Sequence, residues 1–241
     1  MLKKLLVPCM LIALAPLFAA CGSPGVQGNA PTPQMAANLG LARKGLSPSE
    51  VDLPCTQPDA EAKLAVVSCR VFRHMGETVH LVGEIENKGD TALGKLGIKA
   101  AGLSNEGQAM DSKTDQPYFD PVVPGKRTPF RIFLDARDVA KVELTTSGQP
   151  VSGAPAAGLE VSNVTVSEPS SGYTHLRGEV KNPGSDAVDG VLIAVLRDES
   201  GQVVEVHRQS LLQPIPSGAS TFDVLALHRG AKTAEVSIFP K

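Results

Sequence analysis

The sequence predicts an all-β protein, with two tandem immunoglobulin-like antiparallel β-sandwich domains after a flexible N-terminal tether. Apolar and polar residues alternate over short segments, which is the period of a half-buried strand. A block of the chain recurs at a constant offset, which indicates a duplication. Gly and Pro are plentiful, Trp is absent and only 2 Tyr occur. This composition favours short strands and many turns over a helical bundle.

Residues 1–20 have the layout of a secretory signal, because Lys3 and Lys4 precede an apolar run that ends in small residues. That run is shorter than the ~20 residues a membrane-spanning helix needs, and Pro8 and Pro16 interrupt it. We therefore expect a leader that is removed rather than a transmembrane anchor.

The end of the leader, Leu17-Phe18-Ala19-Ala20-Cys21, resembles the lipobox of bacterial lipoproteins. The resemblance implies that Cys21 is lipidated, becomes the first residue and holds the protein on a membrane of the cell envelope. Gly22 stands where an Asp would resemble an inner-membrane retention signal, so the outer membrane is favoured if the organism has one. The alternative is an ordinary secretory signal that leaves Cys21 as a free thiol.

The net charge and the cysteine content indicate which class of partner is not expected and which cellular compartment is. The net charge is −2 and no basic cluster occurs, so a nucleic-acid partner is not expected. Cys9 is removed with the leader and Cys21 is the expected lipid site. Cys55 and Cys69 are then the two cysteines that remain, and they form one possible pair. In an oxidising compartment this pair predicts a disulfide, which contributes ~3 kcal/mol by restricting the unfolded chain. Zinc is the alternative, but no His pair stands nearby at ligand spacing.

Residues 21–50 are rich in Gly, Pro, Ser, Ala and Asn and predict a flexible tether, spanning about 30 Å as a coil. The first domain is expected over 51–147 and the second over 159–241. Between them, residues 148–158 carry Gly148, Pro150, Gly153 and Pro155, which predict a linker that lets the domains move.

The duplication is visible in the segment 80–89, HLVGEIENKG, which recurs over 175–184 as HLRGEVKNPG. The offset is 95 here and slips to 92 further on, as changes in turn length would produce. The 95-residue offset pairs Leu64 with Leu159, Leu96 with Val191 and Ile98 with Ile193, and the 92-residue offset pairs Pro124 with Pro216 and Phe130 with Phe222.

Alternation assigns faces to the strand in each copy. In the first, Val79, Leu81 and Ile85 are expected to face the core, and His80, Val82 and Glu84 the solvent. In the second, Leu176 and Val180 face inward, and His175, Arg177, Glu179 and Lys181 outward. One solvated face indicates antiparallel sheets. A break in phase between Val66 and Cys69 predicts a bulge, and Gly201 is expected to supply a positive φ in the turn 198–201.

The second copy is similar to the FxLYD-type domain of bacterial envelope proteins. The resemblance rests on Gly178-Glu179-Val180-Lys181-Asn182, the run from Val191 to Leu196, Asp198, Gly201-Gln202-Val203-Val204, Pro216 and Phe222. The first copy departs from it at Ala101-Gly102-Leu103-Ser104. The resemblance implies a binding or spacer module and brings no catalytic residue.

No constellation of residues predicts an enzyme, a cofactor or a metal site. His80 and His175 occupy equivalent positions, but a metal needs more than two ligands, and duplication explains the recurrence. Glu84 and Glu86 are expected on a solvated face. Neither a nucleophile elbow nor a glycine-rich phosphate loop occurs.

Tyr118 and Phe119 gather aromatic rings that the second copy lacks. They are expected either to cap the core or to contact a partner protein, since aromatic rings are favoured anchors. The function that follows is a non-enzymatic, lipid-anchored envelope protein, a spacer or adaptor that binds a partner protein at the membrane surface. The alternative is a glycan- or peptidoglycan-binding module, which the absence of Trp disfavours. The oligomeric state is left open.

Overall fold

The computed structural model describes residues 53–59, 63–74, 78–152, 158–168, 174–226 and 230–241. The described residues form strands and turns without helices, which confirms the all-β class and the β-sandwich architecture. None of these residues belongs to a helix long and apolar enough to cross a membrane. The strands are β1 (Cys55–Thr56), β2 (Leu64–His74), β3 (Thr78–Asn87), β4 (Leu93–Leu103), β5 (Ala109–Asp115), β6 (Arg127–Asp135), β7 (Lys141–Pro150), β8 (Glu160–Ser167), β9 (Thr174–Asn182), β10 (Gly190–Arg197), β11 (Val203–Ser210), β12 (Gly218–Ala226) and β13 (Thr233–Pro240).

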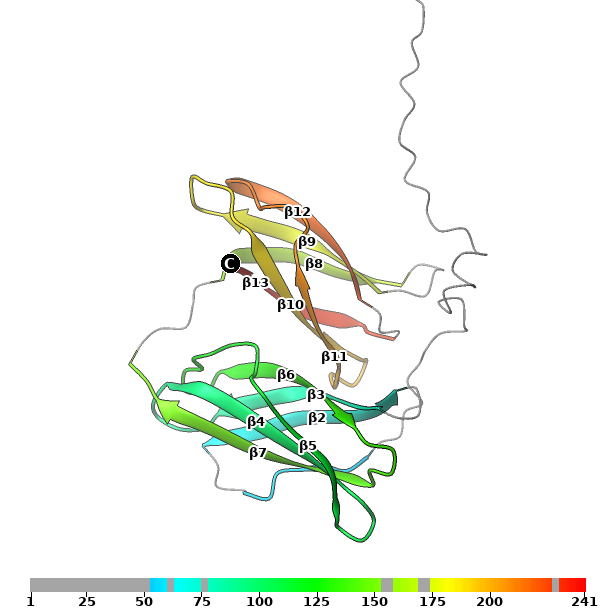
Figure 1. Ribbon diagram of the computed structural model, residues 1–241. Helices are drawn as coiled ribbons and strands as arrows, with labels where there is room; N and C mark the ends of the chain where they lie inside the picture. The colour runs from blue at the N-terminus through cyan, green and yellow to red at the C-terminus, as the bar shows by residue number, and fades with distance from the viewer. Residues whose placement is uncertain (1–52, 60–62, 75–77, 153–157, 169–173, 227–229) are drawn as a thin grey trace, which may run out of the picture. The chain divides into compact units, whose positions relative to one another are not determined.

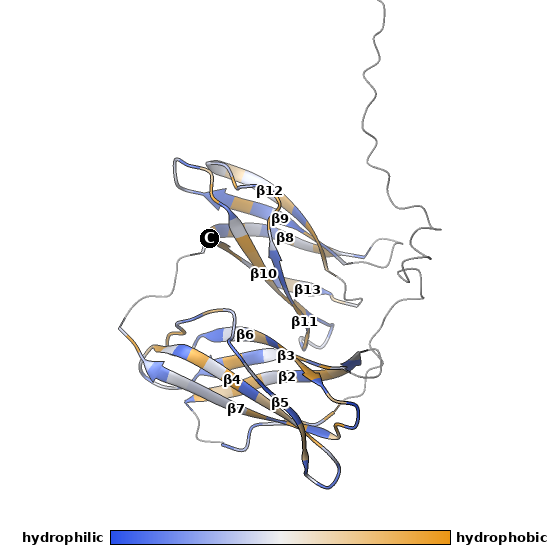
Figure 2. Ribbon diagram, viewed as in Figure 1, coloured by the Kyte–Doolittle hydropathy of each residue, from blue (hydrophilic) through white to orange (hydrophobic). Residues whose placement is uncertain are grey.

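The strands build two sandwiches, each with its own core (Figures 1 and 2). The first sandwich consists of the sheets β1-β7-β4-β5 and β2-β3-β6, and the second of β11-β10-β13 and β12-β9-β8. The neighbouring strands pair antiparallel as expected, except that the short β1 lies parallel to β7. Val79, Leu81 and Ile85 lie in the first core and Leu176 and Val180 in the second, so the inward faces were predicted correctly.

A glycine at equivalent places in the two copies gives a phenylalanine ring room in the core. Gly83 pairs with Phe130 across β3 and β6, and Gly178 pairs with Phe222 across β9 and β12. A Cβ on Gly83 would lie 2.7 Å from the Phe130 ring, and a Cβ on Gly178 2.6 Å from the Phe222 ring. These distances are shorter than carbon atoms tolerate, so each ring packs where a side chain is missing. The shared packing agrees with the duplication.

Local irregularities lie where the sequence places them. The register of β2 against β3 shifts between Val66 and Ser68, which confirms the bulge. Gly201 has a φ of 79° and donates from its N–H to the carbonyl of Asp198 at 3.1 Å, which confirms that turn. The first copy differs from expectation at its end, because β7 continues through Pro150 into the predicted linker.

The predicted disulfide between Cys55 and Cys69 is present. It joins β1 of one sheet to β2 of the other, and so closes one side of the first sandwich. Gln57 extends the same closure: its Oε1 accepts from the Val66 N–H at 2.8 Å, and its Nε2 donates to the Leu64 carbonyl at 2.9 Å. The segment around Cys55 therefore covers the outer edge of β2.

A buried asparagine ends the equivalent strand of each copy. Asn87 donates from Nδ2 to the carbonyls of Thr91 at 2.8 Å and Val122 at 2.9 Å, and its Oδ1 accepts from the Gly89 N–H at 2.9 Å. Asn182 makes the same three bonds in the second copy, with Asp186, Ile215 and Gly184. The side chain thus ties the turn after the strand to the Val122 or Ile215 carbonyl, which also accepts from the backbone N–H of Leu93 or Val188.

The leader, Cys21 and the tether lie outside the described residues. All described residues fall within one compact unit. The division into domains over 51–147 and 159–241 stays a prediction.

Candidate functional site

A third apolar cluster lies between the two sandwiches, and we call it the interface cluster. Phe72 and Val82 of the first sandwich are buried in it with Ile193, Val195, Val203 and Val206 of the second. Val82 was expected to face solvent, and this expectation is wrong, because the outer face of β2-β3-β6 meets β10 and β11.

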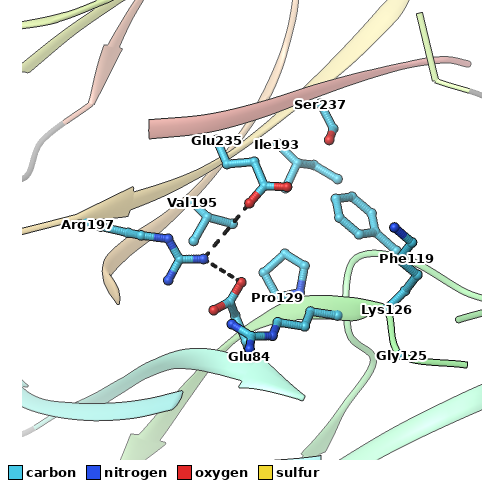
Figure 3. Close-up of a pocket in the computed structure, with 11 residues that line it drawn as sticks. Glu84, Phe119, Gly125, Lys126, Pro129, Ile193, Val195, Arg197, Glu235 and Ser237 are labelled. Atoms are coloured by element: carbon cyan, nitrogen blue, oxygen red, sulfur yellow. Dashed lines mark hydrogen bonds and ion pairs between the residues drawn. The ribbon is translucent and has the colours of Figure 1, made fainter. Parts of the chain in front are cut away.

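The interface also holds ionic pairs. Glu84 Oε1 accepts from Arg197 Nη2 at 2.8 Å (Figure 3). Arg70 Nη1 donates to Asp198 Oδ2 at 3.4 Å. The Glu84 side chain is only 4% exposed, so its expected place on a solvated face is wrong. The second oxygen, Oε2, is buried and has no hydrogen-bond partner among the described residues. Burial of a carboxylate is tolerated only with a charged partner, so Glu84 depends on Arg197.

A cavity of about 270 Å³ adjoins this ion pair. Its apolar walls are Phe119, Pro129, Ile193 and Val195, and its charged groups come from both sandwiches (Figure 3). Arg197 approaches Glu235 to 4.0 Å at the rim, where the Glu235 side chain is 73% exposed. The arrangement combines apolar contacts with ion pairing. The charged lining residues are Glu84, Lys126, Arg127, Arg197 and Glu235.

Tyr118 and Phe119 both lie half-buried against the interface cluster. The ring centroids of Phe119 and Phe239 are 5.2 Å apart and tilted by 50°. The segment also follows the edge of β6, because the Tyr118 N–H donates to the Pro129 carbonyl at 2.9 Å. Phe119 therefore contacts the second copy of the repeat. A contact with a partner protein stays a prediction.

The two equivalent histidines have different surroundings. His80 stacks on Phe133 with ring centroids 4.4 Å apart, and its ring centroid lies 6.1 Å from that of Phe72 in the interface cluster. His175 lies on the outer face of β9, and its Nδ1 is 3.1 Å from Asp223 Oδ1. With Arg177, it holds the pKa of Asp223 below its usual range. Among the residues the structure describes, no three His, Cys, Asp or Glu side chains gather as metal ligands would.

The interface was missed from the sequence, although the repeat contained a signal. Val82 aligns with Arg177, and Phe72 aligns with Ser167 at the 95-residue offset. Apolar residues thus replace polar ones on the outward face of one copy only. Such a difference between duplicated strands indicates that the face is covered in one copy and solvated in the other.

His207, on β11, is held between two acceptor oxygens. Its Nδ1 lies 3.3 Å from Glu205 Oε1 and its Nε2 lies 3.2 Å from Gln209 Oε1. Burial acts to lower the pKa of His207, but the hydrogen bonds to Glu205 and Gln209 and the charge of Glu205 outweigh it, against a smaller opposing effect of Arg131. The net result is a raised pKa, because the imidazolium can donate from both nitrogens.

A raised folded pKa stabilises the fold at low pH. The contribution of His207 is complete below the unfolded pKa of about 6.5 and is lost as the pH rises through the higher folded value. We expect the free energy of unfolding to fall over this pH range in the parent chain, and to fall less in His207→Gln. Urea unfolding from pH 5.5 to 8.5 measures both. An identical pH slope for the two proteins would contradict this assignment.

Comparison with known proteins adds little. No protein family matches the chain, and no curated protein matches it. Among solved structures, red sea bream transglutaminase covers 88% of this chain at 12% identity with a TM-score of 0.23. A β-galactosidase from Bacteroides fragilis covers 72% at 12% identity with a TM-score of 0.18. The matched parts are 31% and 29% of those chains, so this chain spans less than a third of either. Likenesses this weak carry no functional argument.

Proposed function

We propose that this chain is a non-enzymatic, lipid-anchored protein of the cell envelope, which acts as a spacer or adaptor and binds a partner protein at the membrane surface. The observation that carries the proposal is the disulfide between Cys55 and Cys69. Structural disulfides persist in oxidising compartments, which lie beyond the cytoplasmic membrane in bacteria. The leader and Cys21 point to the same compartment and add a lipid attachment.

The contacts between the sandwiches support a spacer role. The interface cluster and the Glu84–Arg197 pair connect the two copies through side chains. A spacer transmits position only if its parts keep their arrangement. The disulfide adds to this by fixing β1, the first described strand after the tether, to the body of the first sandwich.

Replacement of the proposed lipid site tests the anchor. We expect Cys21→Ser to move the protein from the membrane fraction to the soluble fraction and to abolish incorporation of labelled palmitate. Cys9→Ser is the matched control, because Cys9 lies inside the leader, and it should leave both measurements unchanged. Retention of Cys21→Ser on the membrane, or absence of label in the parent protein, would contradict the proposal.

A further inference from the structure

The two copies of the repeat differ at one equivalent sheet edge, which is β6 in the first copy and β12 in the second. In the first sandwich, β6 is the edge strand of β2-β3-β6, and the segment before it covers that edge. Pro129 of β6 accepts at its carbonyl from the Tyr118 N–H, and the Asp135 N–H donates to Asp111 Oδ2 at 2.8 Å. Pro129 also has no N–H to leave unpaired. The first copy therefore protects this edge.

In the second sandwich, β12 is the equivalent edge strand (Figure 1). Thr221 corresponds to Pro129, because they pair with the equivalent residues Glu179 and Glu84. The segment before β12 lies against the start of β10 instead, because the Leu211 N–H donates to the Gly190 carbonyl at 2.9 Å. Among the described strands, β9 alone pairs with β12.

The outward backbone groups of β12 follow from this equivalence. In an antiparallel strand, the N–H and C=O of one residue point to the same side, and successive residues alternate. In the first copy, the Pro129 carbonyl and the Asp135 N–H point away from β3. The N–H and C=O of the equivalent Thr221 therefore point away from β9. The same parity gives four outward residues, which are Ala219, Thr221, Asp223 and Leu225.

We propose that β12 pairs antiparallel with β12 of a second copy of this chain, so that two β12-β9-β8 sheets become one six-stranded sheet. In the register that we infer, Thr221 lies opposite Asp223 of the second copy, and Ala219 lies opposite Leu225 of the second copy. Every outward N–H and C=O of the four residues then meets a partner, with the two-fold axis passing beside Phe222.

Side chains favour this register over its neighbours. Leu225 is 49% exposed, and in this register it packs against Ala219 of the second copy. A shift by one pair in one direction places Asp223 directly opposite Asp223 of the second copy, where like charges repel. A shift in the other direction leaves Leu225 without a partner. In the inferred register the two Asp223 residues are diagonal, and each keeps its own Arg177, with Nε 2.8 Å from Asp223 Oδ2.

The difference between the two copies at this edge suggests a variant that tests the pairing. Thr221→Pro introduces the residue that the first copy has at this position and removes one outward N–H, while the bonds to β9 come from the other residues. Thr221→Val keeps the N–H and is the matched control. The full chain is used with Cys9→Ser and Cys21→Ser, in a mild detergent, so that intermolecular disulfides and the apolar leader do not cause association.

Sedimentation equilibrium measures the mass, and hydrogen exchange measures each amide. We expect the mass of the parent chain and of Thr221→Val to rise toward twice the monomer's with concentration, and Thr221→Pro to remain monomeric. The amides of Ala219, Thr221, Asp223 and Leu225 should gain protection with concentration in the parent chain. Protection at Phe222 and Val224 shows that Thr221→Pro is folded. A parent chain that stays monomeric, a dimer unaffected by Thr221→Pro, or a dimer that leaves the four amides unprotected would each overturn the proposal.

Discussion

Arg197→Ala is expected to destabilise the protein by about 3–5 kcal/mol, because it leaves the carboxylate of Glu84 buried without its charged partner. Glu84 is 3% exposed, and the only hydrogen bond to its carboxylate among the described residues comes from Arg197 Nη2. The loss should also loosen the interface cluster, since Val195 and Arg197 lie on the same outward face of β10. Guanidinium chloride unfolding measures the change in the free energy of unfolding.

Arg177→Ala is the control for this prediction. Arg177 also pairs with a carboxylate, Asp223, but its side chain is 59% exposed. Exposed ion pairs contribute about 0–1 kcal/mol, so the control should lose no more than that. In the double variant Glu84→Leu with Arg197→Leu, no charge is left buried, so the double variant should recover much of the loss. An equal cost for Arg197→Ala and Arg177→Ala would contradict the dependence of Glu84 on Arg197.

Asn182→Ala is expected to cost about 2–4 kcal/mol, because the three hydrogen bonds of this buried side chain are lost together. Asn87→Ala should cost a similar amount in the first copy, where the same three bonds are made. Thermal and urea unfolding measure both.

Asp186→Ala and Thr91→Ala control for changes in the turn itself. Each contributes only its backbone carbonyl to the asparagine, so their exposed side chains should be replaceable at a cost within about 0.5 kcal/mol. A result in which Asn182→Ala costs no more than Asp186→Ala would show that the side chain does not support the turn.

The fold could be predicted from the sequence because its signals are local or repeated. Alternation in 79–85 and 175–181 assigned the core faces of β3 and β9, and the 95-residue offset located the second copy. The disulfide between Cys55 and Cys69 could be predicted because the leader indicates an oxidising compartment. These are also the two cysteines that remain after Cys9 and Cys21 are assigned. Gly201 was recognisable because a turn there requires a positive φ.

The site between the sandwiches could not be predicted in the same way. The partners of Glu84 and Val82 come from β10 and β11, more than 100 residues later, and alternation cannot say whether an outward face meets solvent or another sheet. The roles of Asn87 and Asn182 were also missed, because Asn followed by a nearby Gly indicates a turn without showing that the side chain is buried.

We expect the interface cluster and the Glu84–Arg197 pair to hold the two sandwiches in one fixed arrangement. Residual dipolar couplings, measured by NMR for backbone amides of β2, β3 and β6 and of β10, β11 and β13, report whether the two sandwiches share one orientation. We predict that a single alignment tensor fits both sets, and that Arg197→Ala separates them into two. Two tensors of different magnitude in the parent chain would show that the sandwiches move independently despite these contacts.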